Sequence, residues 1–192
     1  MVGMSAGWQV STPTVKSLLA AILHGFPFPV SFHIIAGSCG EMNSNQLVRE
    51  AKSMQATHMM TIGADIEFFP WAIEQLMEHE KLIIGGPFNF RALPPTSTIV
   101  MFDEGEPLGK HPAPHELPRE IFKCRALPGD FTLIDMKVFD MISPPYFVNE
   151  WSEDGKVFTT CDVYFCNKLR AAGIDIWCDP NAQVNHIGLY QY

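Results

Sequence analysis

The chain is poor in basic residues and has no cluster of them. Lys and Arg together number 13 in 192 residues, against 21 Asp and Glu, so the formal net charge is -8. Proteins that bind nucleic acid through its phosphates need Lys and Arg gathered on one face. The composition therefore argues against a nucleic-acid surface, and we expect no nucleic-acid partner.

Long apolar runs are also missing. The most apolar early segment, residues 17–26, is about half as long as a membrane-spanning helix must be, and His24 and Gly25 interrupt it. We expect a buried helix there and no transmembrane segment. The first residues lack the basic start and the small-residue cleavage site of a secretory signal, so a cytoplasmic location is expected.

Cysteine pairs with metal-binding spacing are absent. The five cysteines are an odd number with no CxxC motif, at positions 39, 124, 161, 166 and 178. Neither a disulfide framework nor a zinc ribbon is indicated. We expect small core residues or free thiols.

The residues that are present describe a folded α/β protein. Apolar residues make up 47% of the chain and charged residues 18%, and the length suits a single domain over residues 1–192. Strands are predicted at residues 2–4, 30–38, 58–65, 81–88, 97–102, 125–136, 175–179 and 184–188, and helices from residue 11 or 12 and at 43–56, 70–80, 137–142 and 160–173. This alternation indicates an open, mostly parallel sheet with helices on both faces.

Ligands bind such sheets beyond the carboxyl ends of the strands. Ser5, Gly37 and Asp65 fall at those ends. Residues 92–123 are rich in proline and predict a long loop that lies over the site.

The segment TIGADIEFFP, residues 61–70, resembles the DxD region of glycosyltransferases with the GT-A fold. In that region an apolar strand ends in Asp-x-Asp and a Pro opens the next helix. Asp65 matches the second Asp, whereas Gly63 stands in place of the first. The resemblance implies a Mn2+ or Mg2+ ion at Asp65, with Glu67 as a candidate substitute for the missing carboxylate. The alternative is that Asp65 only caps the following helix.

Two later segments complete the resemblance. DPNAQVNHIG is similar to the closing strand of the family, which implies that His186 joins Asp65 on the metal; a structural strand-end histidine is the alternative. CDVYFCNKLRAAG is similar to the family's helix that opens with Glu-Asp, which implies that Asp162 is the catalytic base. Cys161 replaces the Glu of that motif. A capping role for Asp162 remains the alternative.

The substrate-binding residues follow from weaker similarities. SNQLVREA resembles the helix start on the nucleotide side, where Asn45 matches and Ser44 replaces an Arg, so Asn45, Ser5 and Asp65 are expected to bind the nucleotide. PGDFTLID resembles the strand before an acceptor-facing loop, which places Gly129, Asp130 and Phe131 on the acceptor side. GGPFNFR fits the strand after the DxD helix, where Arg91 reaches a phosphate or an acidic group of the acceptor, or is solvated.

The resemblance covers residues 2–188 in the right order and is closest to family 2-like glycosyltransferases. It implies a GT-A glycosyltransferase, an enzyme that moves a sugar from a UDP or GDP donor to the hydroxyl of a glycan or another acceptor. The alternative is a non-catalytic nucleotide- or glycan-binding module that keeps the fold. A nucleotidyltransferase on a related sheet is a third reading, disfavoured because MSAGWQVS has no basic residue.

Overall fold

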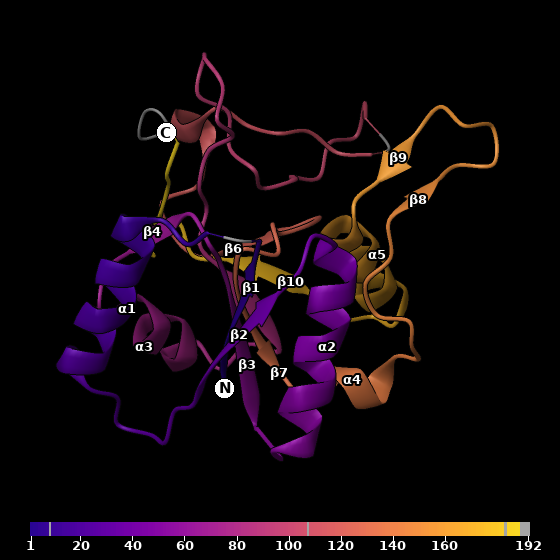
Figure 1. Cartoon of the computed structure of the whole chain (residues 1–192). Coiled ribbons are helices and arrows are strands. Elements are labelled where there is room, and N and C mark those ends of the chain that lie inside the picture. Colours follow the sequence, from indigo (N-terminus) through magenta and orange to yellow (C-terminus); the bar gives the residue numbers. More distant parts are fainter. Residues whose placement is uncertain (8, 107, 183, 189–192) are drawn as a thin grey trace.

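A mixed sheet forms the centre of the computed structural model, which describes residues 1–7, 9–106, 108–182 and 184–188 (Figure 1). The sheet has seven strands in the order β2-β1-β3-β7-β5-β10-β6. Their bounds are β1 (Val2–Ala6), β2 (Phe32–Ala36), β3 (His58–Gly63), β5 (Ile83–Gly85), β6 (Phe122–Cys124), β7 (Phe131–Asp135) and β10 (Ile176–Cys178). Strands β2, β1, β3, β5 and β10 run in one direction, and β7 and β6 run against them. The predicted open, mostly parallel sheet is confirmed.

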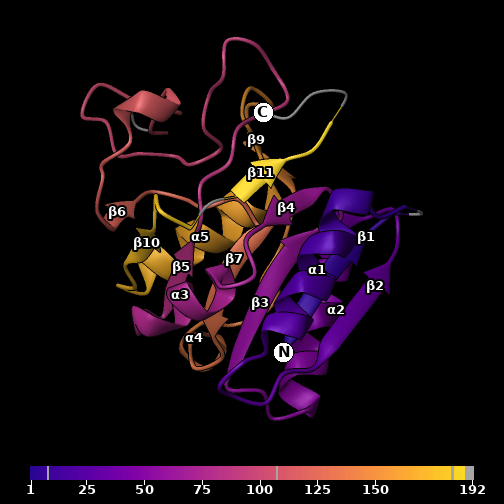
Figure 2. The same cartoon turned by 90° about the vertical axis from the view of Figure 1, so that its left-hand side faces the viewer.

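Helices cover both faces of this sheet (Figures 1 and 2). On one face lie α1 (Thr12–His24) and α3 (Ala72–Glu78), and on the other lie α2 (Gly40–Ser53), α4 (Val138–Met141) and α5 (Cys161–Ala171). Two clusters of buried apolar side chains fill the two interfaces. One joins Leu47 of α2 to Phe165 of α5, and the other joins Ala21 of α1 to Leu76 of α3.

Local sequence signals set the helix ends. Ser11 precedes α1, and its hydroxyl accepts a hydrogen bond from the backbone N–H of Thr14 at 3.2 Å, while Pro13 sits in the first turn. After α5, Gly173 adopts φ +76°, a left-handed conformation that ends the helix. Both boundaries agree with the sequence prediction.

The first helix is less buried than its composition suggests. Ser17 and Ala21 face β4, and the Ser17 hydroxyl accepts a hydrogen bond from the backbone N–H of Phe68 at 3.0 Å. Leu19 and Leu23, on the outer side, are 54% and 87% exposed. The prediction of a buried helix is therefore wrong, because α1 packs on the sheet through small residues and turns its larger apolar side chains outward.

The proline-rich part of the chain, from residue 92, runs above the carboxyl ends of the central strands (Figure 1). The edge strand predicted at residues 97–102 does not form there. Only isolated bridges occur, including Val100 with Ala126 and Met101 with Lys110. A short 3-10 helix, Pro114–Glu116, follows in this segment, and a hairpin of β8 (Glu150–Trp151) and β9 (Phe158–Thr159) lies farther along the chain.

A second, two-stranded sheet lies beside the end of β3. It pairs β4 (Ile66–Phe68) with β11 (Val184–His186) in antiparallel register, with His186 opposite Ile66. The backbone N–H of Ile187 donates to the Asp65 carbonyl at 2.8 Å. This register places the His186 side chain next to that of Asp65.

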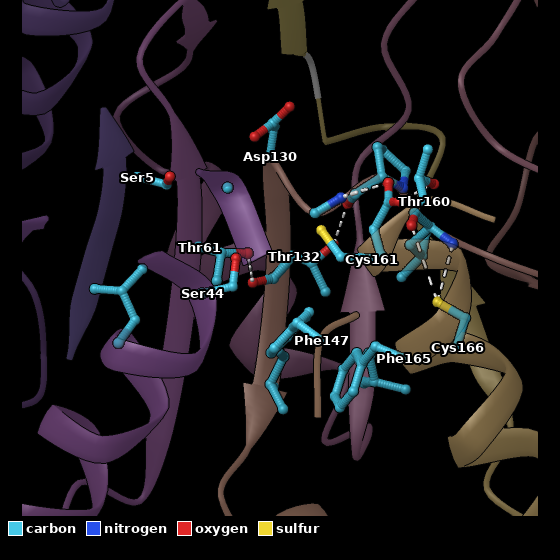
Figure 3. Close-up of a pocket in the computed structure, with 18 of the residues that line it drawn as sticks. Ser5, Ser44, Thr61, Asp130, Thr132, Phe147, Thr160, Cys161, Phe165 and Cys166 are labelled. Atoms are coloured by element: carbon cyan, nitrogen blue, oxygen red, sulfur yellow. Dashed lines mark hydrogen bonds between the residues drawn. The ribbon is translucent and has the colours of Figure 1, made fainter. Parts of the chain in front are cut away.

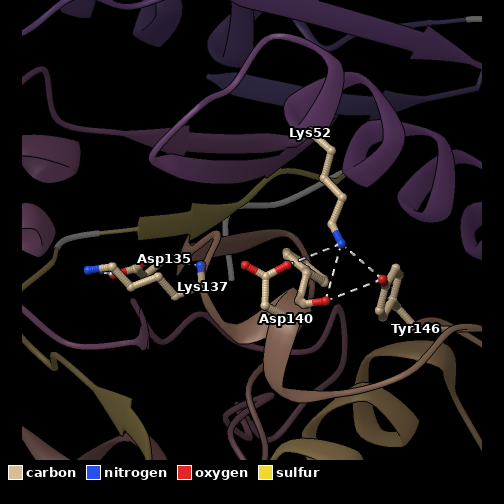
Figure 4. A network of polar contacts seen from close by, with 6 residues as sticks. Lys52, Asp135, Lys137, Asp140 and Tyr146 are labelled. Carbon is tan, nitrogen blue, oxygen red and sulfur yellow. Dashed lines mark hydrogen bonds and ion pairs between the residues drawn. The ribbon is translucent and has the colours of Figure 1, made fainter.

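Polar contacts tie α2 to α4 at the far end of the sheet, near the start of β3 (Figure 4). The ammonium of Lys52 donates to the Phe139 carbonyl at 3.1 Å and to the Tyr146 hydroxyl at 3.2 Å, and lies 3.8 Å from Asp140 Oδ1. These bonds hold the chain that leads from α4 back toward the site. In the part of the chain that the structure describes, no helix has the length and apolar character needed to cross a membrane.

A buried and an exposed leucine on the same side of the sheet predict different costs for the same substitution. Leu76→Ala removes a fully buried side chain from α3 and should lower the free energy of unfolding by about 2–5 kcal/mol. Leu23→Ala removes an 87% exposed side chain from α1 and should change it by no more than about 0.5 kcal/mol. Urea unfolding monitored by circular dichroism measures both; equal losses would contradict this packing.

Candidate active site

A cavity of about 270 Å³ opens between the sheet and the N-terminal turns of α2 and α5 (Figure 3). Its lining is polar at one end, where Asp130 and Thr160 lie, and aromatic at the other, where Phe147 and Phe165 lie. The polar end coincides with the carboxyl ends of β1 and β3, the position expected for a ligand in this architecture.

Asp65 and His186 meet at this edge of the sheet. The Nε2 atom of His186 lies 3.6 Å from Asp65 Oδ2, and its Nδ1 lies 3.0 Å from the carbonyl oxygen of Asn89. Because a carbonyl can only accept, Nδ1 carries the proton and donates, which leaves the lone pair of Nε2 toward Asp65. The structure thus brings together two residues that are far apart in the chain, and in this tautomer the nitrogen nearer to Asp65 is the one able to bind a cation.

The environment of His186 favours its neutral form. Burial lowers the pKa of the imidazole from its ordinary value of 6.5; the hydrogen bond to Asn89 opposes this, Arg91 adds to it, and Asp130 opposes it. A neutral imidazole can ligate a cation, whereas a protonated one cannot.

Arg91 is the cation that faces Asp65. Its guanidinium forms an ion pair with the Asp65 carboxylate, and its side chain is 42% exposed. The sequence analysis expected Arg91 to contact a phosphate or an acid of the acceptor, or to be solvated. It missed this pairing because the segment after β5 has no periodic pattern that fixes its path. Glu67, the candidate substitute carboxylate, lies instead beside Asn185, whose amide donates to it at 3.3 Å.

Asp162 lies in the first turn of α5, and both oxygens of its carboxylate have contacts. Oδ1 accepts from the Thr160 hydroxyl and from the backbone N–H of Val163 at 2.9 Å, and Oδ2 lies 3.4 Å from the backbone N of Gly129. Burial, and then the charge of Asp162, raise the pKa of the preceding Cys161 thiol to about 11, which favours its protonated form at neutral pH.

Asp130 lies between the Asp65–His186 pair and Asp162. It is exposed at the polar end of the cavity, and the neighbouring protein atoms partly desolvate its carboxyl group. This desolvation, followed by the negative charge of Asp162, raises its pKa, while His186 and Arg91 act in the opposite direction. The solvent contact and the raised pKa are compatible, since a wall of protein on one side is enough to weaken hydration.

Some of the other predicted substrate residues line the cavity, and the others are engaged in internal contacts of the fold. Ser5 lines the cavity, as does Gly129. Asn45 is engaged with the backbone: its amide N donates to the Phe147 carbonyl at 2.7 Å, and its amide O accepts from the N–H of Phe147 at 3.3 Å. Phe131 is fully buried and packs on Phe68 with 5.2 Å between ring centres. The nucleotide role of Asn45 and the acceptor role of Phe131 stay predictions without a supporting contact.

Asn43 is a site residue that the sequence analysis missed. It is 5% exposed, and its amide N donates to the Ser5 hydroxyl at 3.0 Å and to the Gly37 carbonyl at 3.2 Å. It therefore fixes the ends of β1 and β2. Helix α2 begins at Gly40, earlier than predicted, and this start turns Asn43 toward the sheet.

The donor set at Asp65 suits a divalent cation only as a partial shell. Across the residues that the structure describes, no three His, Cys, Asp or Glu side chains converge closely enough to hold a metal by themselves. One carboxylate oxygen and one neutral imidazole nitrogen are ligands that Mn2+ accepts. The remaining positions of such a shell would have to be filled by oxygen atoms of a bound diphosphate or by water.

Comparison with known proteins supports the fold. No protein-family model matches the chain, and no curated protein is significantly similar to it in sequence. The structure is similar to that of A197 from STIV, with a TM-score of 0.68 and 12% identity, over 97% of this chain and 84% of that one. It is also similar to GalNAc-T7, solved with UDP, GalNAc and Mn2+, with a TM-score of 0.58 and 10% identity, over 100% of this chain and 44% of that one.

The chain therefore has an α/β fold of the GT-A type, that of the nucleotide-diphospho-sugar transferases, as its motifs predicted. It spans less than half of the GalNAc-T7 chain. These likenesses establish the fold alone, and the closer assignment to family 2 stays a prediction.

The His186 geometry predicts a low titration midpoint. Because burial lowers the pKa of this imidazole, its ring should lose its proton below pH 6.5 and be neutral at pH 7. Nitrogen-detected NMR across pH 4–8 measures this midpoint and the tautomer together. The variant His186→Gln, which lacks the resonance, provides the assignment. A midpoint above 6.5, or a proton on Nε2 at neutral pH, would contradict the proposed orientation.

Proposed function

We propose that the protein is a glycosyltransferase that moves a sugar from a UDP or GDP donor to the hydroxyl of a glycan or another acceptor. The observation that carries the proposal is the pairing of Asp65 with His186 just beyond β3, together with Asp162 in the cavity at the same end of the sheet, where it contacts Gly129. The likeness to GalNAc-T7, whose solved structure contains UDP, GalNAc and Mn2+, supports the same assignment.

The diphosphate end of the donor would lie at Asp65, His186 and Arg91. Asp65 and the free Nε2 of His186 would hold Mn2+ or Mg2+, which supplies positive charge to the leaving diphosphate. Arg91 now pairs with Asp65, so its guanidinium is already placed to bind a phosphate oxygen once that carboxylate is engaged elsewhere. Ser5, oriented by Asn43 at the end of β1, would face the nucleoside.

The proton of the acceptor hydroxyl would pass to Asp162. A base must be held in place, and the Thr160 hydroxyl and the N–H of Gly129 contact this carboxylate. Oδ2 has the looser contact, at 3.4 Å, and is therefore the oxygen free to accept the proton. Phe147 and Phe165 line the inner end of the cavity with apolar surface.

Replacing the base should separate binding from transfer. Asp162→Asn keeps the shape but removes the proton acceptor, so turnover should fall by roughly 100-fold or more while nucleotide affinity stays unchanged. The assay is release of free nucleotide from a panel of UDP and GDP sugars with Mn2+ and mixed hydroxyl acceptors, with binding measured by calorimetry. Asp140→Asn, at the far end of the sheet, is the matched control.

Two results would count against this assignment. Unchanged turnover in Asp162→Asn would show that Asp162 is not the catalytic base. Binding of a nucleotide sugar by the unaltered protein without release of nucleotide under any condition would favour the non-catalytic binding module, which the same fold allows.

Metal dependence should follow Asp65 and His186 together. We expect UDP or GDP to bind more tightly with Mn2+ than with EDTA, and either Asp65→Asn or His186→Ala to remove most of that difference. A loss of at least about tenfold is expected, because even the outer partners of metal ligands contribute 10–100-fold. Calorimetric titrations with and without EDTA measure it. An unaltered metal effect in both variants would place the cation elsewhere.

A further inference from the structure

Gly63, the position where a DxD motif would carry its first carboxylate, lies directly against Asp130. A Cβ atom built on Gly63 would be 2.9 Å from both the Cβ and the Cγ of Asp130 and 3.0 Å from its Oδ1. Real Cβ atoms essentially never lie closer than 3.0 Å to a non-bonded heavy atom, so a side chain at position 63 would have to displace Asp130. The Asp130 side chain therefore occupies the space into which a side chain at position 63 would project.

Backbone pairing holds residues 63 and 130 side by side. The N–H of Gly63 donates to the Asp130 carbonyl at 2.8 Å, so residues 63 and 130 face each other across the ladder between β3 and β7. The end of β3 lacks the first carboxylate of a DxD motif, and the adjacent start of the neighbouring strand β7 carries a carboxylate at Asp130. The two positions are 67 residues apart in the chain (130 minus 63), and only the pairing of these strands brings them together.

Asp130 also lies between the two halves of the proposed site. Asp65 is two residues beyond Gly63, and Gly129, the other neighbour, contacts Asp162. The charges of Asp162 and Arg91 act on the Asp130 carboxyl group in opposite directions. In any productive arrangement the transferred sugar must lie between the diphosphate and the base, which is where this carboxylate stands.

We propose that Asp130 takes the place of the carboxylate that position 63 lacks and binds hydroxyl groups of the donor's sugar. The proposal rests on the glycosyltransferase function proposed above. Ionised carboxylates accept hydrogen bonds from two hydroxyls at once, which suits a sugar. Asp130 then distinguishes a nucleotide sugar from the bare nucleotide, rather than contacting the acceptor as the sequence predicted.

The binding test compares each nucleotide sugar with its sugar-free nucleotide. With Mn2+ present, Asp130→Asn should weaken binding of the best UDP or GDP sugar roughly 10–100-fold, the value of hydrogen bonds to a charged group, and leave UDP or GDP unchanged. Relocating the carboxylate in the double variant Gly63→Asp with Asp130→Gly should recover most of the loss that Asp130→Gly causes alone. Asp140→Asn is again the control.

A ligand-free measurement tests the shared space by itself. Gly63→Ala should lower the Tm by roughly 2–8 °C, because the new methyl group displaces Asp130. In an Asp130→Gly background the same change should have little effect, since the space is then open. Equal effects in both backgrounds would contradict the claim that a side chain at position 63 and the Asp130 side chain compete for the same space.

The binding outcomes separate this proposal from the one it rests on. If the unaltered protein binds no nucleotide or nucleotide sugar, the glycosyltransferase function and the sugar contact both fail. If it binds them and Asp130→Asn keeps its preference for the sugar form, only the sugar contact fails. An equal loss for the nucleotide and its sugar would assign Asp130 to the diphosphate instead and overturn the sugar contact, as would a double variant without recovery.

Discussion

The short antiparallel pair of β4 and β11 is the constraint on which the site depends. Each strand is only three residues long, yet their register sets His186 opposite Ile66 and so beside Asp65. A shift of one residue would turn the imidazole to the other face of this small sheet. The carbonyl of Asn89 then fixes which ring nitrogen carries the proton. The chemistry proposed for the diphosphate end follows from these two backbone features.

Much of the architecture could be predicted from the sequence, because it is written in local patterns. The cap at Ser11, the stop at Gly173 and the apolar runs of β3 and β7 were each visible in a few neighbouring residues. The failures arose where tertiary packing decides. Helix α1 is apolar enough to be buried, but nothing covers its outer side among the described residues, and residues 97–102 have the composition of a strand without a neighbouring edge that accepts more than isolated bridges.

The site could be predicted in part for the same reason. The resemblance to GT-A motifs drew attention to Asp65, Asp162 and His186; the structure pairs Asp65 with His186 and places Asp162 in the cavity at the same end of the sheet. The contacts that define their states were not predictable: the ion pair of Arg91 and the hydrogen bonds of Asn43 depend on how distant segments lie together. Asn45 matched a motif, but a single turn of helix decides whether such an amide faces a ligand or, as here, the backbone of residues 146–147.

The tight packing of Asp130 on Gly63 also restricts how this sequence can evolve. A mutation that restores a side chain at position 63 meets an occupied space, so it is tolerated only after residue 130 has become smaller. Loss of the Asp130 side chain, in turn, leaves the site with one carboxylate fewer until an acidic residue arises at position 63. The two positions are therefore epistatic, and every single-step path between the two arrangements passes through an intermediate that is either overcrowded or lacks a charge.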